Sequence, residues 1–78
     1  MLKVATAFVL IHTDLGGKTD VMKELKTIKE VKEAHRIYGV YDIIARIEAG
    51  SMMDLKDIIS EKIRRLYGVR STVTMVTL

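Results

Sequence analysis

Residues 38–42, YGVYD, gather two aromatic rings, a glycine and an acid in one short connection. As a simple turn, the glycine bends the chain and Asp42 stabilises the bend through local hydrogen bonds. As a ligand loop, Gly39 lets the backbone approach a small molecule, and Asp42 orients an ammonium group or stiffens the loop. The residue types alone leave both interpretations open.

His12 and His35 are the only histidines, and neither has a second metal ligand at a suitable spacing. A single histidine near a strand end is commonly hydrogen-bonded or partly exposed. One alternative is a dimeric enzyme in which His12 or His35 acts as a general base. No Ser-His-Asp or paired-carboxylate pattern supports it, so we expect no catalysis, no metal and no cofactor.

The segment GKT at residues 17–19 resembles the end of a phosphate-binding loop, GxxxxGK[ST]. His12 stands where that loop needs its first glycine, so the tight turn that wraps a phosphate is lost. Lysines cluster around the same region, but glutamates lie among them and no aromatic stacking residues accompany them. We therefore expect neither nucleotide binding nor direct nucleic acid binding.

The composition describes a small folded unit. The 78 residues carry a net charge of +3 and contain no cysteine, which predicts one domain over residues 1–78 and no disulfide. No apolar stretch is long enough to span a bilayer and no signal peptide is evident, so we expect a cytoplasmic protein. The absence of Asn and Gln, with abundant Lys, Arg and Glu, favours a thermophilic origin.

Hydrophobic periodicity predicts four strands. Residues 2–13 read as a buried strand, and residues 31–38 as a more polar one with strict alternation. In residues 43–48, Ile43, Ala45 and Ile47 share one face, and YGVYD joins this strand to the preceding one as a hairpin. The last strand spans residues 69–78.

Two helices separate these strands. The first is capped by Thr19 or Asp20 and runs to about Lys29. The second begins at a capping box in which Ser51 and Asp54 exchange hydrogen bonds, and Gly68 ends it. Its buried stripe is formed by Leu55, Ile58, Ile59, Ile63 and Leu66.

The element order is therefore strand, helix, strand, strand, helix, strand. Right-handed crossovers predict a ferredoxin-like α+β sandwich, with a four-stranded antiparallel sheet, both helices on one face, and the first and third strands as the crossover strands. In the first strand both alternating sets of residues are apolar, so the second face also needs cover. We predict an isologous dimer formed sheet to sheet.

These features together resemble a known family. GVYD at 39–42 leading into IIARIEA, and GVRSTVTMVTL at 68–78, look like the RAM domain, the effector-binding C-terminal half of the Lrp/AsnC transcriptional regulators. The resemblance covers essentially the whole chain. Without an N-terminal DNA-binding domain, the chain looks like a stand-alone RAM protein.

The resemblance implies a ferredoxin-like dimer, assembled into octamer or decamer rings, that binds a free amino acid between dimers. By similarity, residues 39–42 form the effector loop, and strand hydroxyls help to close the pocket. The implied ligand-binding residues are Gly39, Val40, Tyr41, Asp42, Ser71, Thr72 and Thr74. A full-length Lrp/AsnC regulator is an implied partner. A purely structural oligomerisation module is the remaining alternative.

Overall fold

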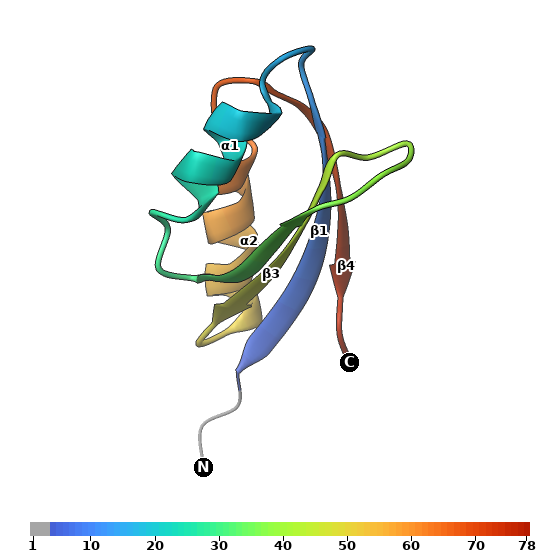
Figure 1. Cartoon of the computed structure of the whole chain (residues 1–78). Helices are drawn as coiled ribbons and strands as arrows, with labels where there is room; N and C mark the ends of the chain where they lie inside the picture. The colour runs from blue at the N-terminus through green and yellow to red at the C-terminus, as the bar shows by residue number, and fades with distance from the viewer. Residues whose placement is uncertain (1–3) are drawn as a thin grey trace.

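The computed structural model describes residues 4–78 and contains one sheet with two helical segments against it (Figure 1). Its elements follow in the predicted order. They are β1 (Ala5–Thr13), α1 (Lys18–Leu25), β2 (Val31–Arg36), β3 (Ile43–Ala49), α2 (Met52–Ile58), the π-helical turn η1 (Ile59–Ile63) and β4 (Val69–Val76). The strand expected at residues 2–13 thus begins later, and residues 2 and 3 lie outside the described part of the chain.

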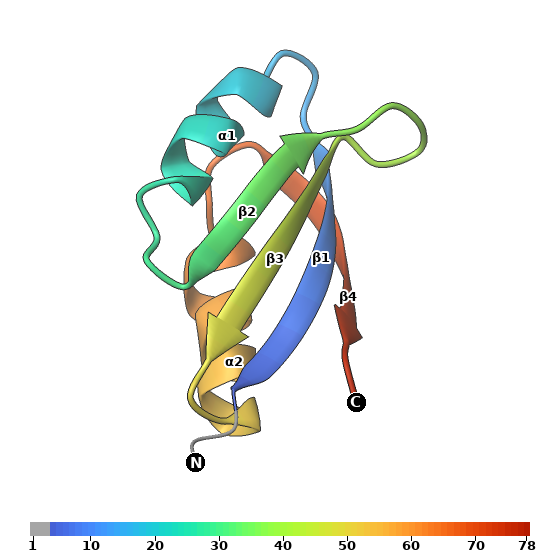
Figure 2. The same ribbon diagram turned by 60° about the horizontal axis from the view of Figure 1, so that its bottom comes forward.

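All strand pairs are antiparallel, in the order β2-β3-β1-β4 (Figure 2). The predicted ferredoxin-like fold is therefore confirmed, with β1 and β3 in the centre. Both helical segments cover the same face of the sheet, and the other face is bare (Figure 1). We call this bare side the open face.

The core lies between the sheet and the helices. Period-2 alternation turns one side of β1 and of β3 inward, and the helices supply the other half. The buried apolar residues are Ala7, Val9, Ile11, Val21, Met22, Leu25, Ile43, Ala45, Ile47, Leu55, Ile59 and Ile63. Within the expected stripe of the second helix, Leu55, Ile59 and Ile63 are buried, whereas Ile58 and Leu66 are only partly buried.

Helix α1 differs from the prediction at both ends, because it begins earlier and ends earlier than expected. Its N-cap is Gly17, which has no side-chain cap, instead of Thr19 or Asp20. It ends at Leu25, four residues before Lys29, because Thr27 turns the chain: its N–H and its hydroxyl both donate to the carbonyl of Glu24, at 3.1 and 2.7 Å. These contacts replace the regular i→i−4 pattern.

Strand β2 does not alternate strictly, contrary to the prediction. A bulge lies between Val31 and Glu33, so Val31 pairs with Ile47 and Ala34 pairs with Ala45. An extra residue in one strand shifts its alternation by one position. Val31 and Ala34 consequently both pack against the core.

The second helix begins at the predicted cap, where the Ser51 hydroxyl accepts from the Asp54 N–H at 3.1 Å. The return bond from the Ser51 N–H to the Asp54 carboxylate is not among the hydrogen bonds of residues 4–78. The helical segment ends at Ile63 with Arg64 as its C-cap, so the stop predicted at Gly68 is wrong. Gly68 lies in the turn that leads into β4, where its φ of +95° favours glycine and an added Cβ would lie 3.3 Å from Val21 Cγ2.

Candidate functional site

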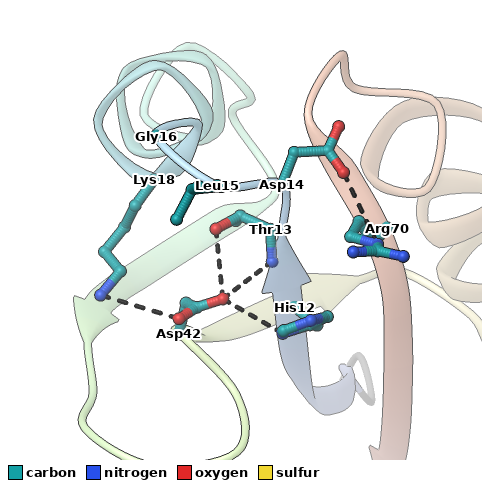
Figure 3. A pocket seen from close by; sticks show the side chains of 8 residues that line it. All are labelled: His12, Thr13, Asp14, Leu15, Gly16, Lys18, Asp42 and Arg70. Carbon is teal, nitrogen blue, oxygen red and sulfur yellow. Dashed lines mark hydrogen bonds and ion pairs between the residues drawn. The ribbon is translucent and has the colours of Figure 1, made fainter.

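The side chain of Asp42 connects the loop at residues 37–42 to the end of β1 (Figure 3). Its Oδ2 accepts hydrogen bonds from the Thr13 N–H at 2.9 Å and from the Thr13 hydroxyl at 3.2 Å. Its own N–H donates to the carbonyl of Ile11, and its carbonyl accepts from the N–H of Ile37, both at 2.9 Å. Asp42 is thus fixed at backbone and side chain.

Two basic side chains approach the same carboxylate. Lys18 Nζ lies 3.7 Å from Oδ1, and His12 Nδ1 lies 3.3 Å from Oδ2. The Nδ1 atom is buried, and although it is within ion-pair distance, it makes no hydrogen bond within the described residues. The contact between His12 and Asp42 is therefore an ion pair when the imidazole is protonated.

These contacts set the charge of Asp42. The hydrogen bond from the Thr13 N–H lowers the pKa of the Asp42 carboxyl, partial burial opposes this effect, and the Thr13 hydroxyl, Lys18 and His12 lower the pKa further. The carboxylate form is favoured because it accepts hydrogen bonds and faces positive charge. Asp42 is accordingly an anion at neutral pH.

Local backbone structure brings the basic groups to this point. After Thr13 the chain turns, with the Asp14 N–H donating to the Gly68 carbonyl at 2.7 Å and the Gly17 N–H donating to the Asp14 carbonyl at 2.8 Å. Helix α1 then starts at Lys18, directly above Asp42. Arg70, near the start of β4, pairs with Asp14 at 3.6 Å.

An open cavity of about 410 Å³ lies among these groups. Its lining residues are His12, Thr13, Asp14, Leu15, Gly16, Lys18, Asp42 and Arg70. Small-molecule sites typically measure about 300–1,000 Å³. Two acidic and two basic side chains line this cavity. The acids could pair with the ammonium group of a zwitterion, and the basic side chains could pair with its carboxylate.

The loop that carries the predicted effector residues projects from the sheet away from the helices (Figure 1). At its tip, Gly39 has φ +149°, a conformation that favours glycine. Tyr38 and Val40 are fully or largely exposed, while the Tyr41 ring meets His12 edge-on with centroids 6.5 Å apart. The loop therefore has an anchored inner side and a bare apolar outer side.

The predicted strand residues do not line this cavity. Ser71 lies opposite His12 in the ladder, whereas Thr72 and Thr74 lie opposite Ile11 and Val9. Thr72 and Thr74 line a different hollow, on the helix side of β4. Within one chain, Asp42 and these threonines therefore line separate hollows.

Sequence reasoning missed several groups around Asp42. The sequence pattern indicates His12 as a possible base and as the residue that breaks the phosphate-loop motif, and Lys18 as part of that motif, but it indicates no role at this site for Thr13 or Arg70. Lys18 could have indicated the site from the sequence, because it is a cation at the junction of a strand and a helix. His35 is not part of the cavity and instead pairs with Glu33 at 3.2 Å, both side chains being largely exposed.

No cluster of three or more His, Cys, Asp or Glu that could hold a metal occurs within residues 4–78. In the same range, no helix is long and apolar enough to cross a membrane.

Comparison with known proteins agrees with this architecture. A solved structure called FFRP-DM1 superimposes with a TM-score of 0.92 at 40% identity, covering 95% of this chain and 99% of that one. A hypothetical protein from Pyrococcus horikoshii gives 0.89 at 40% identity, covering 95% and 89%. Escherichia coli AsnC, at 24% identity and a TM-score of 0.89 over 95% of this chain and 50% of its own, shows the same fold.

Sequence comparison identifies the family. An uncharacterised HTH-type transcriptional regulator of Pyrococcus furiosus is 36% identical over 75 residues, which cover 92% of this chain and 50% of the regulator. The chain thus spans half the length of this curated relative. The family profile described as Lrp/AsnC ligand binding domain matches residues 6–78. The chain belongs to the Lrp/AsnC ligand-binding domain family, a family of regulatory domains and not of enzymes, as the sequence predicted.

Proposed function

We propose that this domain senses a free amino acid and converts its binding into a change of assembly state. The observation that carries the proposal is the loop at residues 37–42, which is anchored by Asp42 beside a cavity of mixed charge and exposes Tyr38 and Val40. A rigid loop with a bare outer side suits a pocket that a neighbouring subunit completes.

Asp42 acts in this proposal chiefly by stiffening the loop. Its Oδ2 is already occupied by both donors of Thr13, so it has little capacity left for a ligand ammonium group. The backbone of residues 39–41 would then hold the amino acid. Ser71, Thr72 and Thr74 of a neighbouring subunit would close the pocket.

The assembly begins with a dimer through the open face. Phe8, Leu10 and Ile44 lie in the middle of this face, where Leu10 pairs with Ile44 and Val73. Val73 and Met75 extend it on β4 and are partly exposed. A second copy would cover these side chains, and dimers would then join through their loops into an octamer or decamer ring that holds the effector between dimers.

Regulation would pass through a partner. Residues 4–78 form one sheet with its helices packed against it, and within this range strands separate α1 from α2, so there is no helix-turn-helix unit. Similarity to HTH-type regulators supports mixed assemblies with a full-length relative, in the cytoplasm. The effector would shift the populations of these assemblies according to its differential affinity for them.

A melting screen tests the proposal. Each of the twenty amino acids is added to the protein at several protein concentrations, since a ligand that binds only the folded assembly raises the melting temperature. We expect at least one amino acid to raise it and to change the mass measured by light scattering. Asp42→Ala should weaken binding on the order of tenfold while leaving the dimer intact.

Asp57→Ala removes a similar charge from the surface of α2 and serves as the matched control. If no amino acid changes the melting temperature, a purely structural oligomerisation module explains the domain better. If binding is found but Asp42→Ala and Asp57→Ala bind equally well, the role assigned to Asp42 is wrong.

A further inference from the structure

A second hollow lies between the α2–η1 segment and the edge strand β4, with a volume of about 520 Å³. Its lining residues are Lys56, Ile59, Ser60, Arg64, Thr72, Thr74 and Val76. We call it the β4 groove. It shares no residue with the cavity beside Asp42, and a single chain forms all of it.

The helical side of the groove is cationic. Lys56, Ser60 and Arg64 are spaced four residues apart and therefore lie along one side of the helix. Within residues 4–78, neither Lys56 nor Arg64 has an acidic partner within 4.0 Å. Two neighbours of the same type do have one: Lys62 pairs with Glu30 and Arg65 pairs with Glu61, each at 3.5 Å.

The strand side of the groove supplies hydroxyl groups. Thr72 and Thr74 point to the same side of β4 because they are two residues apart. In the described part of the chain, the hydroxyls of Ser60, Thr72 and Thr74 make no hydrogen bond. Three hydroxyls and two cations, most of them on exposed residues, therefore surround one space and have no partner among the described side chains.

The helix is irregular at this point. The π-helical turn at Ile59–Ile63 is closed by the Arg64 N–H donating to the Ile59 carbonyl at 2.9 Å. Such turns accommodate one extra residue and often occur at functional sites. Here Ile59 and Ile63 are both buried while Ser60 and Arg64 both line the groove.

We propose that the β4 groove binds an oxyanion, with Arg64 and Lys56 pairing with its charge and the hydroxyls of Ser60, Thr72 and Thr74 donating to its oxygens. Arginine holds carboxylate and phosphate through paired N–H groups, and lysine adds a compact charge. The oxyanion is either the carboxylate of an amino acid, in which case the inference rests on the proposed function, or the phosphate group of a metabolite, in which case it does not.

Isothermal titration of the intact protein tests the groove, first with inorganic phosphate and then with the twenty amino acids, at constant ionic strength. Arg64→Gln and Lys56→Gln remove the two charges. Arg65→Gln, in the same turn but outside the groove, is the matched control. Ser60→Ala removes one donor of the groove and leaves the residues of the proposed effector pocket intact, so the test stands even if a charge variant folds poorly.

The groove variants should weaken the bound oxyanion on the order of 10- to 100-fold, and Arg65→Gln should bind like the wild type. If phosphate binds and the groove variants weaken its binding while Arg65→Gln does not, the ligand is a phosphate. This result supports the groove even if no amino acid binds and the proposed function is wrong. Amino acid binding with the same dependence, competed by phosphate, supports the carboxylate.

Amino acid binding that is lost in Asp42→Ala but unchanged in Arg64→Gln overturns the groove and leaves the proposed function standing. The groove proposal is also wrong if Arg64→Gln binds phosphate and every amino acid as well as Arg65→Gln does. It is wrong, too, if the wild-type protein binds neither phosphate nor any amino acid.

Discussion

At the scale of single residues, Asp42 joins the two parts of the candidate site. The same carboxylate that holds the loop to Thr13 also attracts Lys18 and faces His12. Loss of its charge would therefore release the loop and leave the cations without their partner. The stability that Asp42 gives to the folded loop should therefore depend on pH.

The direction of this dependence follows from the lowered pKa of Asp42. Because the folded-state pKa lies below the ordinary value of 3.8, the unfolded chain takes up the proton first as the pH falls. The stabilisation is complete above the ordinary value and is lost as the pH falls through the folded-state value. The difference in unfolding free energy between wild type and Asp42→Asn should therefore be constant near neutral pH and shrink as the pH falls below the ordinary value of 3.8.

Urea denaturation at several pH values measures this difference. Glu30 and Glu33 also have lowered pKa values, from their own hydrogen bonds, but they titrate in both proteins and so cancel. A constant difference across the pH range would contradict the stabilising role of the ionised Asp42.

At the scale of elements, the ends of the helices determine where the side chains of the site lie. Helix α1 has no side-chain cap, so its start depends on the turn at residues 14–17, which also places Lys18. The α2–η1 segment is capped at its start by Ser51 and at its end by Arg64, whose N–H donates to the Ile59 carbonyl. The π-helical turn between these ends shapes the β4 groove.

The cap of α2 yields a prediction about stability. Ser51→Ala should lower the free energy of unfolding by about 1 kcal/mol, because the Asp54 N–H loses its acceptor. Ser51→Asp should retain most of the wild-type value, since aspartate is an equally good cap. Urea unfolding of the three proteins checks this, and equal stability of Ser51→Ala and wild type would show that the cap is not needed.

At the scale of the whole molecule, the open face is the side of the sheet that no helix covers. Its apolar centre is bordered by charged groups: Arg46 pairs with Glu33 and Glu48, and the hydrogen bond from Arg46 lowers the pKa of Glu33. An apolar centre with a charged border is the usual arrangement of a protein interface. One domain of 78 residues also gains much from burial in a partner.

We expect sedimentation to show a dimer or larger assembly at micromolar concentration, and Leu10→Lys to yield monomers by placing a charge at the centre of the open face. Met53→Lys, on the exposed surface of α2, is the control and should leave the assembly unchanged. A wild-type protein that stays monomeric would contradict the sheet-to-sheet dimer.

The thermophilic character stays a prediction from composition. It requires a melting temperature clearly above the roughly 45–65 °C of ordinary mesophilic domains. A value inside that range would remove it.

The sequence by itself determined the element order, the faces of β3 and the cap at Ser51. All of these depend on local rules: a period of two in strands, a period near 3.6 in helices, and the conformations that serine and glycine favour at helix ends. Where a local competitor was overlooked, as with Thr27 in α1 or the bulge in β2, the prediction was wrong.

Only the tertiary structure decided which residues meet. Thr13 and Asp42 are 29 positions apart in the chain and come together because β1 pairs with β3 in one register. Thr72 and Thr74 lie beside Lys56 and Arg64 instead of Asp42 because β4 pairs with β1 on the side away from β3 and the loop that precedes it. Register and crossover geometry are properties of the packed chain, and no local pattern encodes them.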